Sequence, residues 1–119
     1  MHIEELREYC LAKKGVTESF PFDNDTLVFK VMDKMFALFS LERIPLSVNL
    51  KCDPDYAIEL REKHDGLINP GYHMSKKHWN TVIVDGQLSE KLVRHLINHS
   101  YDLVVSKLPK KVKDQFNSL

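Results

Sequence analysis

The sequence predicts an α+β fold, in which a small, mainly antiparallel sheet is covered on one face by helices. Its 119 residues match the usual size of one domain, and no repeat, low-complexity tract or Pro/Gly/Ser-rich linker divides them, so residues 1–119 are interpreted as a single domain. An apolar share of 43% and a charged share of 29% are typical of globular proteins. Strand-like segments joined by short turns favour antiparallel pairing, and the expected order is α-β-β-β-α-β-α.

An amphipathic helix is predicted over residues 3–14. Ile3, Leu6 and Cys10 recur at helical spacing between acidic residues, and lysines close the segment. Acids in the first turns and lysines in the last turn suit the helix dipole, and Gly15 can adopt the left-handed conformation that follows a helix end. The acids at this helix start therefore have a structural reason that needs no ligand.

A turn and three strands are predicted next. Residues 20–25 combine a rigid aromatic step with Asp and Asn side chains that can bond the nearby backbone, which predicts a chain reversal. Leu27–Val31 and Met35–Ser40 are expected to form a hairpin around Asp33-Lys34, because β-branched and aromatic residues favour strands in segments this short. Apolar and polar residues alternate from residue 46 to 51, which predicts a strand with one face on the core and one in water.

A second helix and a further strand are predicted in the second half of the chain. Asp53 as N-cap and Pro54 at the first helical position start a helix that runs to residue 64. A short extended piece at residues 67–69 leads to a strand at Trp79–Val84, which is rich in β-branched residues.

A third helix is predicted after Ser89, which can cap it, and Leu108-Pro109 stops or kinks it. The last ten residues, KKVKDQFNSL, are expected to add a helical turn or two with a frayed end. The residues predicted to form the buried stripe of the third helix are Leu92, Val93, Leu96, Ile97, Leu103 and Val104.

Charge is unevenly distributed along the chain although the net charge is zero. Residues 1–25 carry three bases and six acids, residues 26–52 four and two, residues 53–66 two and five, and residues 67–119 eight and four. The carboxy-terminal half can therefore present a basic face to nucleic acid, and an ordinary solvated surface is the alternative.

The cysteines and the amino terminus argue against several classes of protein. Cys10 and Cys52 lie far apart, with no CxxC or paired Cys/His spacing, so we expect reduced core residues and neither a disulfide scaffold nor a zinc site. No window approaches the run of about 18 apolar residues that a membrane span needs. The amino terminus lacks the basic and apolar regions of a signal peptide, so we expect a cytoplasmic protein without membrane contact.

Four segments that span almost the whole chain carry a family resemblance. The segments EELREYCLAKKG, VFKVMDKMFAL, INPGYHMSKKHWNTVIVDG and HSYDLVVSKLPKK resemble the YjbR/MmcQ family. The resemblance implies a CyaY-like α+β fold and a bacterial cytoplasmic protein of a kind commonly described as DNA-binding. Many relatives differ across residues 20–25, so no role is carried onto that loop, and the family offers no catalytic set to transfer. The most specific residues are Pro70, Gly71, Trp79, Gly86, Ser100, Tyr101, Leu108 and Pro109.

A basic and aromatic set in the carboxy-terminal half is the leading candidate site. Single-stranded nucleic acid is bound by cations that follow the phosphates and by rings that stack on bases. A dense patch would form if the last lysines fold back beside the loop at residues 76–78. The alternative is that Trp79 anchors the core while the lysines only solvate the surface. The residues predicted to bind nucleic acid are Lys76, Lys77, His78, Trp79, Lys107, Lys110, Lys111 and Lys113.

Two other sets of residues are candidates for metal binding. Carboxylates on the first helix and the next loop can hold a hard cation, as the acidic ridge of frataxin-like proteins does. His95 and His99 lie one helical turn apart, but two ligands are too few and no HExxH pattern accompanies them. We expect solvated acids and surface histidines, and assign no metal site. The acidic set is Glu4, Glu5, Glu8, Glu18, Asp23 and Asp25.

The sequence contains no recognisable catalytic motif. A serine nucleophile elbow, a Gly-rich phosphate loop and a CxxC pair are all absent. We therefore expect a monomeric, non-enzymatic protein without a cofactor that binds DNA or RNA weakly through the basic set. A protein-interaction module is the first alternative, and a frataxin-like metal binder is the second.

Overall fold

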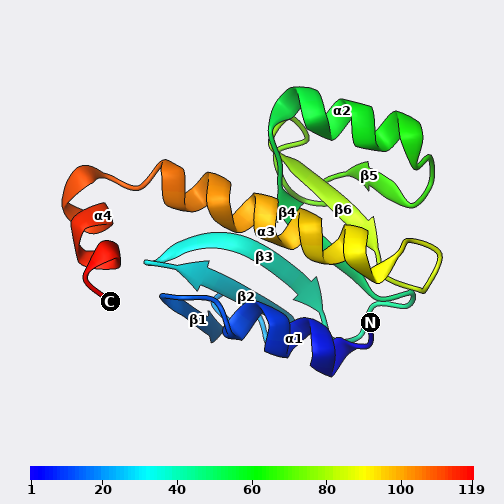
Figure 1. Cartoon of the computed structure of the whole chain (residues 1–119). Helices are drawn as coiled ribbons and strands as arrows, with labels where there is room; N and C mark the ends of the chain where they lie inside the picture. The colour runs from blue at the N-terminus through cyan, green and yellow to red at the C-terminus, as the bar shows by residue number, and fades with distance from the viewer.

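A six-stranded antiparallel sheet forms the centre of the computed structural model, which describes residues 1–119 (Figure 1). Its strands lie in the order β1-β2-β3-β4-β6-β5, and every neighbouring pair is antiparallel, so the predicted fold class is confirmed. The strands are β1 (Val16–Ser19), β2 (Thr26–Val31), β3 (Lys34–Ser40), β4 (Ser47–Lys51), β5 (Ile68–Pro70) and β6 (Trp79–Ile83). The helices are α1 (Ile3–Leu11), α2 (Pro54–Lys63), α3 (Glu90–Ser106) and α4 (Lys110–Asn117).

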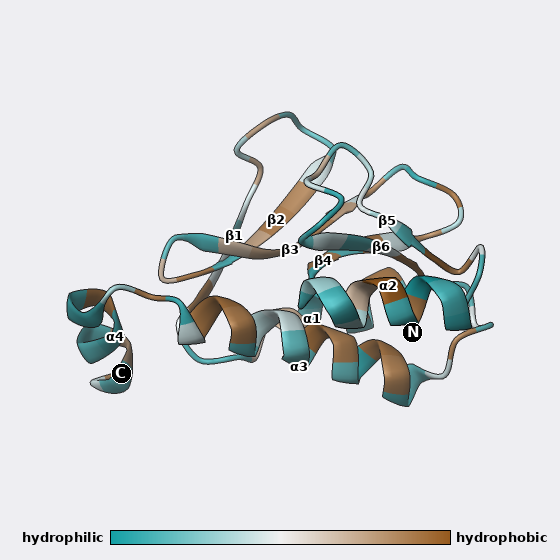
Figure 2. Cartoon of the chain, turned by 90° about the horizontal axis from the view of Figure 1, so that it is seen from above, coloured by the Kyte–Doolittle hydropathy of each residue, from teal (hydrophilic) through white to brown (hydrophobic).

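The helices cover one face of the sheet, as predicted. Helices α1, α2 and α3 lie on one side of the sheet in Figure 2, whereas long loops rise on the other side. Helix α3 runs across the middle and packs against β2, β3 and β4. We call the second face, which carries Val28, Leu38, Asn49 and Thr81, the open face. None of the four helices is long and apolar enough to cross a membrane.

The first helix is shorter than predicted. Helix α1 ends at Leu11 because the chain must turn at once to bring Val16 beside Val31 of β2. The two lysines before Gly15 therefore lie in this turn, and the last turn of α1 carries no basic residue. Gly15 has φ +75°, the left-handed conformation that the sequence predicts for it.

The predicted order of elements is incomplete, because it lacks the two edge strands β1 and β5 and the last helix α4. Strand β1 has one strongly apolar residue, Val16, and β5 has three residues ending on Pro70, so neither carries a strand pattern of its own. Both form by pairing with a longer neighbour. Helix α4 has eight residues, which make about the two turns predicted, and Phe116 near its end is buried beside Tyr101. The observed order is one helix, four strands, one helix, two strands and two helices.

The predicted helix starts and the hairpin are confirmed. The side chains of Asp53 and Ser89 accept hydrogen bonds from the N–H groups of Tyr56 (3.2 Å) and Leu92 (3.1 Å). These two residues therefore cap α2 and α3. The β2–β3 hairpin turns at Met32-Asp33, one residue earlier than predicted, and both residues have the positive φ that a type I′ turn requires.

The hydrophobic core lies between the helices and the sheet. One cluster of 23 buried residues fills this space. The rings of Phe29 and Phe39 stack with their centroids 5.5 Å apart, and Phe36 meets Tyr101 of α3 edge-on at 5.4 Å. Both cysteines are buried in this cluster and form no disulfide, as predicted.

The sheet is weakly joined between β3 and β4, which share only two residue pairs. Beyond these two pairs, the hydroxyl of Ser100 in α3 bridges the two strands. It accepts a hydrogen bond from the N–H of Lys51 in β4 (2.9 Å) and donates one to the carbonyl of Phe36 in β3 (2.6 Å). Ser100 is fully buried, so one helix side chain completes the hydrogen bonding between the two halves of the sheet.

Candidate functional site

A row of paired residues crosses the open face. The row consists of Val28 on β2, Leu38 on β3, Asn49 on β4 and Thr81 on β6. The amide of Asn49 donates to the carbonyl of Tyr72 (3.4 Å), and the N–H of Tyr72 donates to the hydroxyl of Thr81 (2.9 Å). The predicted contact of this face with water is thus only partly right, because these bonds tie the β5–β6 loop down onto it.

A cavity of about 290 Å³ opens where β3, β4 and β6 meet the end of α3. Three lysines, Lys34, Lys51 and Lys107, line it together with apolar side chains that include Trp79. Lys51 and Trp79 are cross-strand partners, and Lys107 directly follows α3. We call this site the basic cavity. Its lining residues are Lys34, Met35, Lys51, Trp79, Val104, Lys107 and Leu108.

The charges of the basic cavity are not neutralised by the protein. The structure contains three ion pairs, and none of them includes Lys34, Lys51 or Lys107. Burial lowers the pKa of the Lys51 ammonium, and the nearby charge of Lys107 lowers it further. An anion in the cavity would relieve this repulsion, so the site is chemically suited to a phosphate or a carboxylate.

Trp79 anchors the structure more than it offers a stacking surface. Its side chain is only 8% exposed and packs with Val28 and Leu38, while Met74 of the β5–β6 loop lies against the same cluster. The structure thus favours the anchoring alternative for this residue. A ligand in the basic cavity would meet part of the indole and could not cover its full face.

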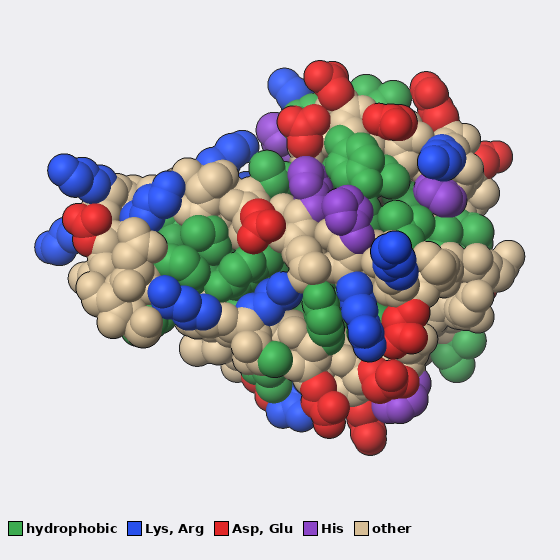
Figure 3. Space-filling view, in the orientation of Figure 1, with side chains coloured by type: hydrophobic (Ala, Val, Ile, Leu, Met, Phe, Trp, Pro, Cys, Tyr) green, Lys and Arg blue, Asp and Glu red, His purple; other side chains and the backbone are tan.

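The structure brings together only part of the predicted basic set. Lys107 and Trp79 meet in the basic cavity, but α4 packs elsewhere, with Phe116 and Leu119 against Gly15. The three lysines of α4 therefore do not fold back beside the loop at residues 76–78. The single dense basic patch that the sequence analysis considered does not form. In Figure 3, Lys and Arg side chains gather at the end of the molecule that carries α4, and acids are frequent over α1 and α2.

The lysines of the β5–β6 loop are exposed and partly engaged within the loop. The ammonium of Lys76 donates to the carbonyl of Gly71 (3.2 Å), and Arg61 of α2 donates to the carbonyl of Lys76. The carbonyl of His78 accepts a hydrogen bond from the N–H of Cys52 (2.8 Å). Lys77 has no such contact and is exposed to solvent.

Two lysines of the basic cavity, Lys34 and Lys51, are absent from the site predicted from the sequence. Lys51 ends the predicted strand, and alternation from Leu50 places its side chain on the face away from the core, which is a usable signal. Lys34 lies beside the hairpin turn and gives no signal of its own. Their approach to Lys107 depends on the packing of α3 against β3 and β4, which are far from it in the chain.

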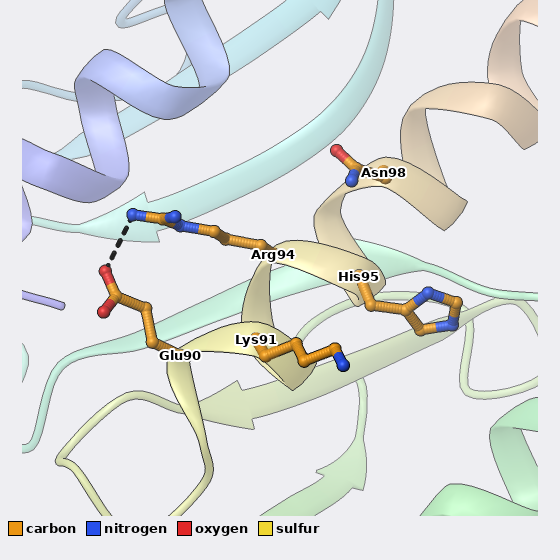
Figure 4. Close-up of a pocket in the computed structure, with 5 residues that line it drawn as sticks. All are labelled: Glu90, Lys91, Arg94, His95 and Asn98. Carbon is orange, nitrogen blue, oxygen red and sulfur yellow. Dashed lines mark hydrogen bonds and ion pairs between the residues drawn. The ribbon is translucent and has the colours of Figure 1, made fainter.

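The groove along α3 in Figure 4 is a poor candidate for a ligand. It encloses about 510 Å³ and is lined by five polar or charged residues and by no apolar side chain. Glu90 and Arg94 form an ion pair at 2.9 Å across it. Asn98 accepts a hydrogen bond from the hydroxyl of Tyr9 in α1 (2.8 Å). Ligand sites usually combine apolar walls with a few polar groups, so this groove is solvated surface between two helices.

The two histidines considered as metal ligands contact neighbouring residues of the protein. No group of three or more His, Cys, Asp or Glu residues is placed to hold a metal ion. His95 and His99 both pack edge-on against Tyr56, and His99 accepts a hydrogen bond from the N–H of Asp53 (3.2 Å). Burial, and then the charge of His95, lowers the pKa of His99. These histidines therefore hold α2 against α3.

The predicted acidic set is divided among separate local contacts. Glu5 and His2 form a capping box at the start of α1, and Glu18 forms an ion pair with Arg7. Asp23 accepts hydrogen bonds from two backbone N–H groups in its own turn, which lowers its pKa. These contacts engage three of the six acids, Glu5, Glu18 and Asp23, within the protein.

Comparison with known proteins identifies a set of bacterial relatives. A family model described as YjbR matches residues 11–103. The Escherichia coli K12 protein named Uncharacterized protein YjbR is 37% identical over 109 residues, which cover 92% of each chain. The Escherichia coli O157:H7 protein named Uncharacterized protein YbdF is 44% identical over 109 residues, which cover 91% of this chain and 88% of the relative.

Two solved structures share the fold. The crystal structure of Deinococcus radiodurans protein DR2400, described as a DUF419 domain, is 40% identical with a TM-score of 0.91, and the match covers 97% of this chain and 87% of that one. A Pseudomonas syringae protein is 30% identical with a TM-score of 0.73 over 87% of this chain and 98% of that one. The names of these relatives state no activity.

Proposed function

The chain belongs to the YjbR family, and from that premise we propose that it is a binding protein rather than an enzyme, with nucleic acid as its ligand. The observation that carries the proposal is the basic cavity. There Lys34, Lys51 and Lys107 converge beside Trp79 without an acidic partner. Phosphate neutralisation by such lysines is the main source of affinity for nucleic acid.

Helix α4 supports the same proposal, because lysines at its start are unfavourable for the helix unless an anion binds there. Lys110 and Lys111 lie in its first turn, which contains no acid, Lys113 follows them, and Pro109 provides no capping side chain. Cations at a helix start oppose the helix dipole, whereas an anion there is stabilised by the dipole and by the free N–H groups. A phosphate backbone that passes from the basic cavity to the start of α4 would turn this conflict into an attraction.

The proposal is tested by fluorescence anisotropy with labelled single-stranded and duplex DNA at about 50 mM salt, where phosphate binding is strong. We expect saturable binding that weakens as salt rises. Lys34→Glu combined with Lys107→Glu should weaken it at least about tenfold and lower the salt slope by about 0.9 for each phosphate that is no longer neutralised. Lys110→Glu combined with Lys111→Glu should act in the same direction.

The matched control changes the same number of charges far from the basic cavity. Lys63→Glu combined with Lys91→Glu alters α2 and the start of α3, so its effect should be clearly smaller. Equal losses in the control and in the test variant would mean that only net charge matters. That result, or no binding at low salt, would reject the basic cavity as a nucleic-acid site.

A protein-interaction role is the second candidate, because apolar side chains in the loops beside the open face are exposed. Ile44 is 94% exposed, and Phe20 and Leu41 are 45% and 44% exposed. This reading predicts a specific protein partner that is retained after nuclease treatment and no longer bound by Ile44→Glu. A partner that disappears with nuclease would instead support nucleic acid.

A further inference from the structure

A second cavity lies on the open face, away from the basic cavity. It encloses about 530 Å³, within the range of small-molecule sites. The loops at residues 20–25, 41–46 and 71–78 contribute to its walls, and strands β3 and β4 contribute to its floor. These loops rise above the sheet on the side without helices (Figure 2). We call this site the loop cavity.

The loop cavity has apolar walls and an aromatic side chain from each of two loops. Leu38 lies in the floor and is 4% exposed, and Met74 packs against the same apolar cluster. Phe22 comes from the first loop and Tyr72 from the third, and they are 65% and 54% exposed. Such side chains suit a flat aromatic molecule, because rings gain from stacked and edge-on contacts.

One cation of the loop cavity is available for a ligand. Arg43 lies over the ring of Tyr72, with its guanidinium carbon 4.7 Å from the ring centroid, and it takes part in none of the three ion pairs. The one carboxylate in the lining, Asp23, is held by the N–H groups of its own turn. Arg43 therefore has no ion-pair partner within the protein, and the charge of Asp23 stays in its own turn of the same lining.

A hydroxyl in the cavity wall adds a polar contact. The side chain of Ser47, a residue that is only 5% exposed, lines the loop cavity. A serine hydroxyl that faces a cavity can donate a hydrogen bond to a ligand oxygen. An arginine and a hydroxyl match the two oxygens of one carboxylate, since a guanidinium and a carboxylate have complementary planar geometry.

We propose that the loop cavity binds a small planar aromatic carboxylate, with its ring against Leu38 and Met74 and its carboxylate on Arg43. This site is separate from the basic cavity and adds a ligand beyond nucleic acid. The two sites border one apolar cluster, because Trp79 of the basic cavity and Met74 of the loop cavity both belong to it.

Two probes test the proposal: 2-naphthoate and its uncharged counterpart 2-naphthamide. Isothermal titration calorimetry measures the affinity of the protein for each. The full chain should bind the carboxylate at least about tenfold more tightly than the amide, since a hydrogen bond to a charged group contributes that much or more. Arg43→Gln should remove this preference and leave binding of the amide unchanged. Arg94→Gln, an equal change on α3, should have no effect.

A second variant and the chemical shifts of amides in the cavity locate the bound probe. Tyr72→Leu should weaken both probes, because it removes the exposed ring that lines the cavity. Amide signals of Leu38, Ser47 and Met74 should shift in the nuclear magnetic resonance spectrum when 2-naphthoate is added. Equal binding of both probes, equal binding by Arg43→Gln, or shifts confined to other regions would overturn the proposal.

One comparison separates this proposal from the proposed function. The variant with Lys34→Glu and Lys107→Glu should bind 2-naphthoate like the unmodified chain even if it no longer binds DNA. Displacement of 2-naphthoate by a short single-stranded oligonucleotide would assign the loop cavity to nucleic acid and reject the carboxylate. Failure of DNA binding alone leaves the predicted preference for 2-naphthoate intact.

Discussion

The two faces of the sheet differ in the residues that pack against them. The helix-covered face contributes to a continuous cluster of 23 buried residues, whereas the open face has a cluster of three, Val28, Leu38 and Trp79. The open face also holds the buried polar side chains of Ser47 and Thr81 and borders both cavities. One face thus supplies most of the hydrophobic stabilisation, which leaves the other free to carry polar side chains beside the two cavities.

The largest expected effect comes from breaking the helix-covered face. Phe36→Ala removes a fully buried ring that packs on Tyr101, and we expect a loss of about 3–5 kcal/mol in the free energy of unfolding. Met35→Ala changes the neighbouring, partly buried residue on the open face and should cost about 2 kcal/mol or less. Urea denaturation measures both, and equal losses would contradict the contrast between the faces.

The next effect concerns the side chain that joins the two halves of the sheet. Ser100→Ala leaves the N–H of Lys51 and the carbonyl of Phe36 without their partner, so we expect a loss of about 2–3 kcal/mol. Ser106→Ala on the exposed end of α3 should change stability by no more than about 0.5 kcal/mol. Faster hydrogen exchange at the Lys51 amide in Ser100→Ala would locate the damage, and unchanged exchange there would reject this role.

A smaller effect is expected from disturbing the open face through its loop. A methyl group on Gly71 would lie 2.7 Å from the Cβ of Trp79 and 3.0 Å from its carbonyl oxygen, so Gly71→Ala must displace the β5–β6 loop. We expect a loss of about 1–3 kcal/mol together with weaker binding of 2-naphthoate, because Tyr72 and Met74 move with the loop.

Gly66→Ala provides the matched control for Gly71→Ala. Gly66 has φ +80° and nothing within 4 Å of an added methyl group. The control should therefore cost about 1 kcal/mol through backbone strain and leave the loop cavity unchanged. Calorimetric melting and probe titration of both variants check this, and equal probe affinities in the two would argue against a role for the loop.

The smallest effect comes from the titration of one buried thiol on the helix-covered face, and between pH about 8 and about 10 it amounts to about 1.4 kcal/mol. Burial raises the pKa of the Cys10 thiol from 9.0 to about 12. The unfolded chain therefore releases this proton at lower pH than the folded chain, and the stabilising difference is lost as pH rises from about 9 to about 12, by about 1.4 kcal/mol for each pH unit. Cys10→Ala should lose less stability than the unmodified chain between pH about 8 and about 10 in urea titrations. Parallel losses would show that the thiol titrates normally.

Local signals in the sequence were enough to predict most of the helix-covered face. Asp53 and Ser89 marked helix starts because capping depends on neighbouring residues alone, and the β2–β3 hairpin followed from its β-branched and aromatic content. No group of three or more His, Cys, Asp or Glu residues is placed to hold a metal ion, and Glu5, Asp23 and His99 are engaged in a cap, a turn and a helix contact.

The two cavities were harder to predict because they depend on contacts between distant segments. Lys34, Lys51 and Lys107 meet only when β3 pairs with β4 and α3 crosses the sheet. Edge strand β1 lacks a strand pattern, and its pairing with β2 decides its conformation. Ser47 alternates with apolar neighbours as an ordinary solvent-facing residue would, and only the loops above it make it buried.

The short edge strands determine how this sheet can meet other chains. Strand β1 has four residues and β5 has three, ending on Pro70, which has no N–H to offer. Long, flat edges act as templates for fibril growth and for partners that add a strand, and short or proline-bearing edges discourage both. We therefore expect the protein to resist amyloid-like assembly, and its partners to recognise it through the open face instead of extending its sheet.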